Sequence, residues 1–360
     1  MNASTPGTDM KVFLSLSEKQ EEEVASFFRK LEFRSHYNSP DWAEWVEPYK
    51  KPMYFCFYEN EQMSGFSIVY VKMSFCVMRF APVVIDTGSI SKYAGQIADY
   101  LKKEKFGLLT VHLPFMEGSD MERSVLEKLK MKHKVSIEKE GWCTIQIQLA
   151  GKTPEDIFKD FSKGHKSSVK KALKEEVEVR MIRDKESLEK LASIYDEMHH
   201  RKGLILPLID SGNVFTRVAE KELGVVAGVF KNNVLLGGVV FISEGNNFLY
   251  KFGATDVQYH HVPVLHIAIY EMIKYAIEAG FKKMDLCGYD PDAKEGSYAY
   301  GVNLFKKGFG GEIIEYVKPL SVRFNNAKFF LVSVASMAKN FLPGGVVKWI
   351  YARTYWIPRN

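Results

Sequence analysis

The sequence contains few cysteines. Its 360 residues include four, and these lie far apart in apolar, strand-like segments without any C-x-x-C pair: Cys56, Cys76, Cys143 and Cys287. Such spacing excludes a disulfide-rich scaffold and a cysteine-based zinc motif. We therefore expect buried free thiols in a reducing compartment.

Export and membrane-spanning signals are also missing. The first residues, MNASTPGTDMKV, lack the basic-then-apolar layout of a secretion signal, and no apolar run reaches the roughly 18 residues that cross a bilayer. We expect a cytoplasmic protein. The segment 326–360 is rich in aromatic and basic residues, and we expect it to form a helical tail. This tail either contacts a membrane surface peripherally or packs on the first domain.

Several enzyme motifs do not occur. The chain has no G-x-S-x-G, no Walker loop and no Rossmann fingerprint, which argues against serine hydrolases, kinases and dehydrogenases. The adjacent histidine pairs, 199–200 and 260–261, have no cysteine or acidic companions, so we predict no metal site. The net charge of +5 permits an anionic partner without requiring one.

A repeated order of elements is present instead. Strand-like segments between 53 and 85 precede a helical segment at 89–107 and a strand at 108–113, and the same order returns in the second half of the chain. The pattern predicts an α/β (α+β) protein of two tandem domains, each a mixed, mainly antiparallel sheet flanked by helices. A helix start at Thr153-Pro154, where Asp156 completes a capping box, marks a boundary near residue 150. The expected domains are 11–150 and 151–325, and the tail follows at 326–360.

Strands, a helix and a further strand in this order resemble the core of the GNAT acyltransferases. A wider succession of segments resembles the FemABX and FemAB-like aminoacyltransferases, which are built from twin GNAT-like domains. The similar segments cover about residues 35 to 320 and include NSPDWAEW, RFAPVVID, LYKFGA, AIEAGFKKMDLCG and FKKGFGG. This resemblance implies transfer of an aminoacyl group from aminoacyl-tRNA to an amine of a peptidoglycan-type cell-envelope precursor, with amide formation and no cofactor.

The resemblance also implies catalytic residues. Lys306 in FKKGFGG matches the family's lysine at the acyl-transfer site, where a cation can stabilise an oxyanion, and Lys307 is the fallback. Without the resemblance, both lysines would be read as flanking an exposed turn. Tyr250 is expected either to hold the substrate or relay a proton, or to pack on the sheet. Asp285 either orients a lysine or the attacking amine, or caps the following turn.

Further basic residues are candidates for binding substrates. Lys166 and Lys170 belong to a set of four lysines at helical spacing, within 163–174, that predicts one basic face for a phosphate backbone. The alternative is a solvated face balanced by nearby glutamates. Arg201 matches the family's pattern at a position that can meet an acceptor's phosphates, although the end of a helix favours a cation in any case.

Two other functions remain open. One is an acyl-CoA-dependent N-acyltransferase acting on an amino sugar or lipid. The segment TDVQYHHVPVLHI, however, has no glycine, and Pro263 has no N–H group for a pyrophosphate cradle. The other is a non-catalytic binder of an anionic glycolipid or nucleic acid.

Overall fold

The computed structural model describes residues 9–31, 33–46, 51–72, 74–114, 118–139, 141–202 and 210–326. Apart from Asn326, the expected helical tail at 326–360 and its membrane contact lie outside these residues. The chain divides into two compact units. The first combines Met1–Gly141 with Tyr316–Asn360, and the second is Trp142–Glu315.

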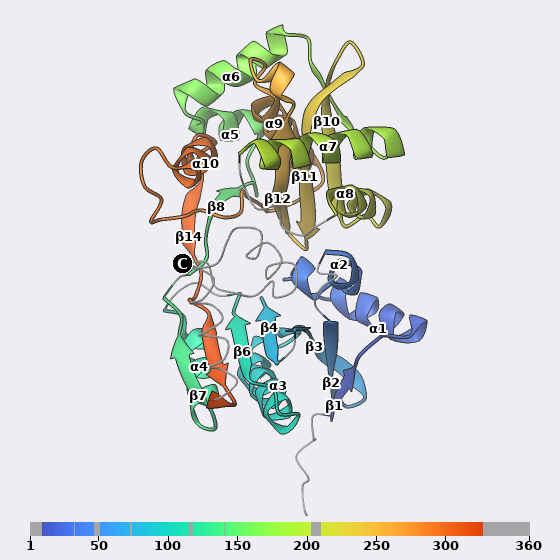
Figure 1. The fold of residues 1–360 in the computed structure, drawn as a ribbon, viewed down its shortest axis with the longest axis vertical. Helices are drawn as coiled ribbons and strands as arrows, with labels where there is room; N and C mark the ends of the chain where they lie inside the picture. Colours follow the sequence, from blue (N-terminus) through green and yellow to red (C-terminus); the bar gives the residue numbers. More distant parts are fainter. Residues whose placement is uncertain are drawn as a thin grey trace, which may run out of the picture. The chain divides into compact units, whose positions relative to one another are not determined.

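The first unit contains one mixed sheet with the order β1-β2-β3-β4-β6-β15-β7, and β5 pairs with β3 (Figure 1). Its strands are β1 (Asp9–Phe13), β2 (Lys51–Glu59), β3 (Gln62–Lys72), β4 (Phe75–Arg79), β5 (Val83–Val84), β6 (Leu108–His112), β7 (Lys134–Ile137) and β15 (Leu320–Arg323). Its α-helices are α1 (Glu18–Arg29), α2 (Pro40–Val46), α3 (Ile90–Lys103) and α4 (Asp120–Lys130). Short 3₁₀ turns cover His36–Asn38 and Thr87–Ser89.

Alternation along β2 shows how this sheet acquires two packed faces. Phe55 and Phe57 belong to one apolar cluster with residues of α3 and α4, whereas Tyr54 and Cys56 belong to another with residues of α1. Successive side chains of a strand point to opposite faces, so a run that is apolar at every position predicts helices on both sides.

The second unit contains a sheet with the order β14-β8-β13-β12-β11-β10-β9. Its strands are β8 (Cys143–Gln148), β9 (Glu178–Met181), β10 (Gly224–Lys231), β11 (Val234–Glu244), β12 (Asn247–Thr255), β13 (Lys283–Asp285) and β14 (Glu312–Glu315). Its α-helices are α5 (Pro154–Asp160), α6 (Lys163–Lys174), α7 (Lys185–Arg201), α8 (Ser211–Glu220), α9 (Val264–Glu278) and α10 (Tyr298–Lys307), with a 3₁₀ turn at Val257–Tyr259.

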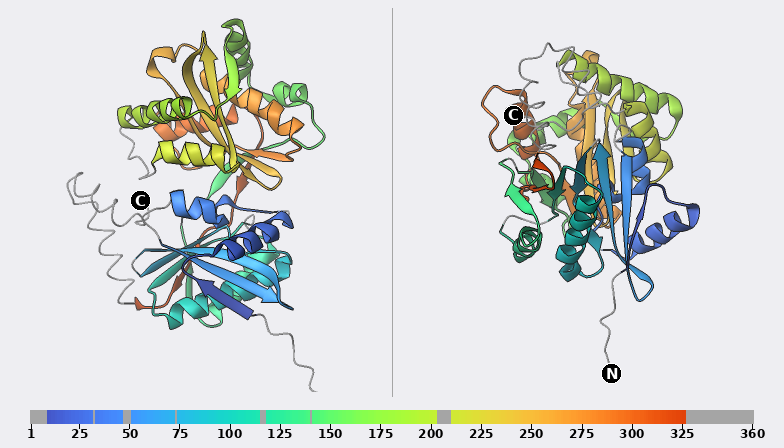
Figure 2. Two further views of the ribbon diagram at one scale, coloured as in Figure 1. Left: turned by 90° about the vertical axis from the view of Figure 1, so that its right-hand side faces the viewer. Right: turned by 60° about the horizontal axis from the view of Figure 1, so that its bottom comes forward.

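Helices cover both faces of this second sheet (Figure 2). Residues of α5, α6 and α9 share one apolar cluster with the inner residues of β8, β10, β11 and β12. On the opposite face α7 packs against β11 and β12, and α8 packs against β10. The arrangement is the mixed, helix-flanked sheet expected from the sequence.

The predicted repeat is confirmed. Each sheet is antiparallel apart from one parallel pair, β4 with β6 in the first unit and β12 with β13 in the second. In each unit the parallel strands are joined through a helix, α3 or α9. Gly280 follows the end of α9 with a φ of +83°, the left-handed conformation that commonly ends a helix.

The structure moves both predicted domain boundaries. The capping box at Thr153 is present, but β8, which precedes it, pairs with β13 and β14 of the second sheet. Similarly, β15 pairs with β6 and β7 of the first sheet. The chain therefore changes units after Gly141 and again after Glu315, because strand pairing decides membership and a helix start does not.

Cys56, Cys76 and Cys143 are free and buried, and Cys287 is free and partly exposed. None of the helices in the described ranges combines the length and the apolar composition that crossing a bilayer would require.

Candidate functional site

The parallel strands of the second unit separate near their carboxyl ends. Backbone pairing between β12 and β13 ends at Leu249↔Asp285, whereas β12 continues to Thr255. In the first unit, β4 and β6 remain paired to their last residues, Arg79 and His112. The carboxyl edge of parallel strands is where α/β proteins place ligands, so the end of β13 is the first place to look for a site.

Lys306 lies at this position although it is a lysine with only 9% of its surface exposed. It belongs to the last turn of α10, and its Nζ donates hydrogen bonds to the carbonyl oxygens of Cys287 at 2.8 Å and Gly288 at 2.6 Å. Burial lowers the pKa of Lys306, and the charges of Cys287 and Asp285 oppose that shift. Among the described residues these two bonds use two of the three N–H groups of the ammonium, so one remains for a substrate oxygen.

Asp285 ends β13 and is 7% exposed. Its carboxylate accepts hydrogen bonds from the Thr144 hydroxyl, from Gln146 Nε2 at 3.0 Å and from the Cys287 N–H at 2.7 Å. Burial raises the pKa of Asp285, and these hydrogen bonds oppose the shift. Asp285 and Gln146 are directly opposite in the pairing of β13 with β8, so their side chains share a face.

The bond to Cys287 links Asp285 to Lys306. Cys287 has a φ of +55°, a left-handed conformation that is costly for a residue with a side chain. The Asp285 carboxylate holds the N–H of Cys287, and the following carbonyls of Cys287 and Gly288 accept from Lys306. Asp285 thus hydrogen-bonds to the turn, which is the capping position that one interpretation of the sequence predicted, and its role in orienting the lysine stays a prediction.

Tyr250 lies on β12 in the core cluster that faces α9. Its ring centroid is 5.4 Å from that of Phe241, and burial raises the pKa of its hydroxyl. A side-chain carbon at Gly253 would lie 2.1 Å from this hydroxyl. The register of β12 against β11 shifts by one residue between Tyr250 and Phe252, and this bulge lets Tyr250 and Gly253 share one face. This is the packing position that one interpretation predicted, and a catalytic role for Tyr250 stays a prediction.

Lys307 has different surroundings from Lys306. It is exposed, and its Nζ lies 5.0 Å from the centre of the Tyr289 ring. The glycines that follow turn the chain from α10 into β14: Gly310 and Gly311 have φ values of +80° and +89°. A side-chain carbon at Gly311 would lie 2.6 Å from the Gln146 carbonyl oxygen, so glycine is required there.

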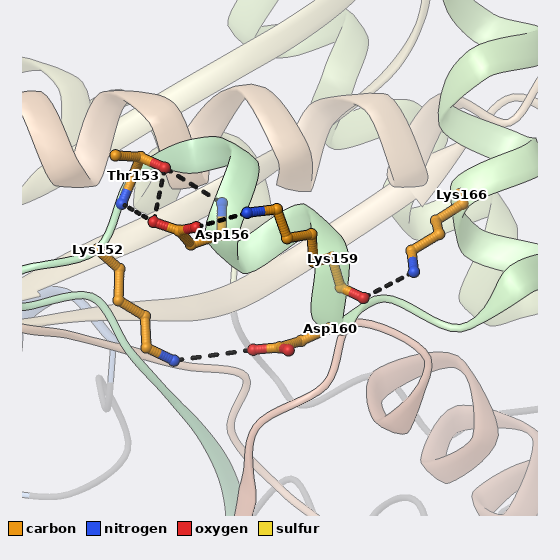
Figure 3. Close-up of polar contacts among 6 residues, drawn as sticks. All are labelled: Lys152, Thr153, Asp156, Lys159, Asp160 and Lys166. Atoms are coloured by element: carbon orange, nitrogen blue, oxygen red, sulfur yellow. Dashed lines mark hydrogen bonds and ion pairs between the residues drawn. The ribbon is translucent and has the colours of Figure 1, made fainter.

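The predicted basic residues Lys166 and Lys170 line one groove on α6. Its volume is about 520 Å³, and its lining consists of Lys163, Lys166, Ser167, Lys170, Lys171 and Lys174. Lys166 Nζ donates to the Lys159 carbonyl at 2.6 Å, at the end of the capped helix α5 (Figure 3). Lys171 Nζ donates to the His261 carbonyl at 2.8 Å. The first turn of α6 contains lysines and no acidic residue, which the helix dipole disfavours, so helix stability does not explain this charge.

Arg201 is exposed at the last position of α7. Its neighbour Lys202 is the residue that contacts α10, because Lys202 Nζ lies 4.7 Å from the centre of the Tyr298 ring. Burial and the charge of Arg201 lower the pKa of Lys202. Sequence reasoning missed Lys202.

Thr144 and Gln146 were also missed, although the sequence carried a signal for them. In the strand CTIQIQ, Ile145 and Ile147 belong to the apolar core, whereas Thr144 and Gln146, which alternate with them, are buried on the other face. Buried polar side chains at alternate positions of a strand indicate a partner on that face, here Asp285. The described residues contain no group of three or more histidines, cysteines or acids placed for a metal ion.

Comparison with known proteins finds similarity to FemAB-type proteins. Residues 217–336 match the FemAB family. A lipid II:glycine glycyltransferase of Staphylococcus epidermidis is 23% identical over 231 residues, which cover 62% of this chain and 54% of that protein. The match therefore spans about half the length of this relative.

Solved structures share the fold. The crystal structure of FemX has a TM-score of 0.72 at 17% identity, covering 89% of this chain and 99% of that one. A tandem GNAT protein from the clavulanic acid biosynthesis pathway has a TM-score of 0.51 at 10% identity, covering 88% of this chain and 99% of that one. The two units are therefore GNAT-like domains in tandem.

Proposed function

We propose that this chain is a FemAB-type aminoacyltransferase that uses aminoacyl-tRNA and forms an amide on an amine of a cell-envelope precursor. The match of residues 217–336 to the FemAB family and the similarity to a lipid II:glycine glycyltransferase support this proposal. The observation that carries this proposal is the buried ammonium of Lys306, held by two carbonyls at the end of β13. A fixed cation in a poorly solvated position is suited to an oxyanion that develops during acyl transfer.

The reaction needs little chemistry from side chains. The acceptor amine attacks the ester carbonyl of the donor, so a C–N bond forms and the carbonyl oxygen becomes an oxyanion. The free N–H of Lys306 stabilises that oxyanion. The ester C–O bond then breaks, and the proton lost by the amine ends on the leaving ribose hydroxyl. Asp285 is a positioning residue in this account, because it acts on Lys306 through the Cys287 turn.

The hydroxyl of Tyr250 is suited to donate a hydrogen bond. Burial raises the pKa of its hydroxyl, so the phenol is protonated at neutral pH and is unsuited to act as a base. We propose that its hydroxyl donates a hydrogen bond to the bound aminoacyl group.

Charge on α6 supports tRNA as the donor. Lys163, Lys170 and Lys174 are exposed along the groove and can each contact a phosphate. The connection from β12 to α9 argues against coenzyme A as the donor. There the N–H of Gln258 donates to the Asp256 carboxylate at 2.9 Å, and Pro263 supplies no N–H at the start of α9. An anion cradle needs free N–H groups and no acid at that place.

The acceptor is proposed by class. The relative from Staphylococcus epidermidis is named for lipid II, which supports a lipid-linked cell-envelope precursor as the class of acceptor. Arg201 is exposed at the end of α7 and Lys307 is exposed at the end of α10, and both are proposed to meet phosphates of the acceptor. A lipid-linked acceptor would bring the enzyme to a membrane surface, whereas a nucleotide-linked acceptor would not.

A transfer assay with paired donors tests the proposal. Purified protein is incubated with bulk tRNA charged with labelled amino acids, or with labelled acyl-CoA, and with lipid-linked or nucleotide-linked muropeptide. We expect a new amide, detected by mass spectrometry, from the tRNA donor alone. Transfer from acyl-CoA and none from tRNA would overturn the proposal.

A further inference from the structure

The start of α6 and the end of α10 are joined by one half-buried imidazole, that of His165. His165 Nε2 lies 2.8 Å from the Phe305 carbonyl oxygen, and its Nδ1 lies 3.1 Å from Ser162 Oγ. A carbonyl oxygen can only accept, so Nε2 carries the proton, and Nδ1 accepts from the Ser162 hydroxyl. These two bonds fit the neutral imidazole with its hydrogen on Nε2.

The Phe305 carbonyl needs this partner. It belongs to the last turn of α10, where helix carbonyls have no N–H four residues ahead within the helix. Phe305 immediately precedes Lys306. The imidazole of His165 therefore holds the peptide that carries the proposed catalytic lysine.

Close packing keeps the imidazole in place. A side-chain carbon at Gly308 would lie 1.9 Å from His165 Cε1, so the ring occupies the space a residue larger than glycine would need. The Ser162 N–H donates to the Gly308 carbonyl at 2.9 Å. His266 of α9 and Phe309 enclose the ring, with centroids 4.6 Å and 4.5 Å away.

We infer that His165 is a positioning residue for acyl transfer, which sets the end of α10 so that Lys306 stays on the carbonyls of Cys287 and Gly288. This inference rests on the proposed function of Lys306. The sequence analysis did not single out His165. Its side chain contacts α10 and is not among the groove-lining residues of the same helix.

The charge state of His165 is consistent with a fixed position against α10. Burial lowers the pKa of His165, and burial together with His165 lowers the pKa of His266 to about 4. The remaining neighbours of His165 are the aromatic rings of Phe305 and Phe309 and the hydroxyl of Ser162. The lowered pKa values favour the neutral form of both imidazoles, and Nε2 of His165 carries its hydrogen in either protonation state, so the hydrogen bond to Phe305 does not depend on protonation of Nδ1.

Two substitutions of similar size separate the hydrogen bond from the packing. The amide nitrogen of His165→Gln can occupy the place of Nε2 and donate to Phe305, whereas His165→Leu fills space without a donor. We expect His165→Gln to keep kcat within about threefold. His165→Leu should lower kcat by about 100-fold with KM for the donor little changed, because a displacement of about 1 Å of a catalytic group costs this much. Equal kcat values for the two variants would overturn the inference.

A matched glycine pair tests the same contact from the other helix. Gly308→Ala would push the imidazole aside, whereas a side-chain carbon at Gly301 on the same helix meets nothing within 4 Å. We expect a loss of kcat in Gly308→Ala and none in Gly301→Ala. In the double variant with His165→Ala the two losses should not add, because both act through the imidazole. Additive losses would count against the inference.

Crystal structures of the His165 variants keep the test independent of turnover. In His165→Gln the Lys306 Nζ should remain within hydrogen-bond distance of the Cys287 and Gly288 carbonyls, and in His165→Leu it should leave at least one of them. An unmoved Lys306 in His165→Leu refutes the positioning role even if no donor is turned over. If the wild-type protein transfers no aminoacyl group while Lys306 moves as expected, the proposed function fails and the structural role of His165 stands.

Discussion

Replacement of Asp285 tests how the site is held together. The carboxylate accepts three hydrogen bonds in the interior, from Thr144, Gln146 and Cys287. Asp285→Ala removes the two oxygens that accept these three hydrogen bonds. Asp285→Asn keeps an amide oxygen for the Cys287 N–H, and the amide group of Gln146 can rotate to face the new NH₂.

The magnitude follows from these contacts. Each buried donor that loses its partner costs about 1–3 kcal/mol, and this is offset in part because the buried carboxylate no longer has to be desolvated. We expect Asp285→Ala to lower the free energy of unfolding by about 3 kcal/mol, and Asp285→Asn by about 1 kcal/mol. In Asp285→Ala the N–H of Cys287 also loses its hydrogen-bond acceptor, so the turn that positions Lys306 is no longer fixed and kcat should fall at least about tenfold.

The assay is urea denaturation together with the kcat of aminoacyl transfer, and the control is Asp292→Ala. Asp292 is exposed in the following loop, where a substitution should change stability by less than about 0.5 kcal/mol. Wild-type stability and kcat in Asp285→Ala would refute the chain of contacts from Asp285 through Cys287 to Lys306.

The pH dependence has a definite sign. Burial raises the pKa of Asp285, so the protonated form is favoured in the folded state. Its stabilising contribution is complete below the ordinary aspartate pKa and is lost as pH rises through the higher folded value. The free energy of unfolding of the wild type, measured relative to Asp285→Asn, should therefore decrease as pH rises through this range. An increase would contradict the assigned environment.

Three further outcomes are expected. Lys170→Ala should reduce the slope of log affinity for tRNA against log salt by about one, measured by filter binding, whereas an unchanged slope would remove this lysine from the interface. Burial and the charge of His165 lower the pKa of His266 to about 4. The contribution of His266 to the free energy of unfolding is therefore complete above the ordinary histidine pKa of 6.5 and is lost as pH falls towards 4. Thermal melts should therefore show a steeper loss over this range in the wild type than in His266→Gln, and parallel curves would contradict the burial. Gly253→Ala should cost about 1–3 kcal/mol in urea denaturation because its side chain would meet the Tyr250 hydroxyl, and a neutral result would place Tyr250 elsewhere.

Local patterns predicted much of the fold because the interactions behind them are local. Three such patterns involve residues only a few positions apart. They are the apolar, strand-forming runs of β2 and β3, the capping box at Thr153 and the glycine after α9. Membership of β8 and β15 in their sheets could not be predicted in this way. Each pairs with strands that are distant in sequence, and nothing in the strand itself says which sheet it joins.

In the candidate site, too, local patterns predicted some residues, whereas contacts between distant segments could not be predicted. Lys306 was predicted from a resemblance, but its burial depends on the left-handed turn at Cys287, which the side chains of β8 help to hold through Asp285. The contact of His165 with Phe305 joins residues 140 positions apart. Such partners become visible only when the helices are placed in space.

The most direct test of the account compares two adjacent lysines. Single-turnover transfer from aminoacyl-tRNA is measured at saturating acceptor for wild type, Lys306→Met and Lys307→Met. The account predicts that Lys306→Met lowers the rate constant by about 100- to 1000-fold, the effect of losing one oxyanion donor. Lys307→Met should leave the saturated rate constant unchanged and affect only the acceptor concentration required. A wild-type rate constant in Lys306→Met would contradict the account, because no other buried cation among the described residues lies at the end of β13.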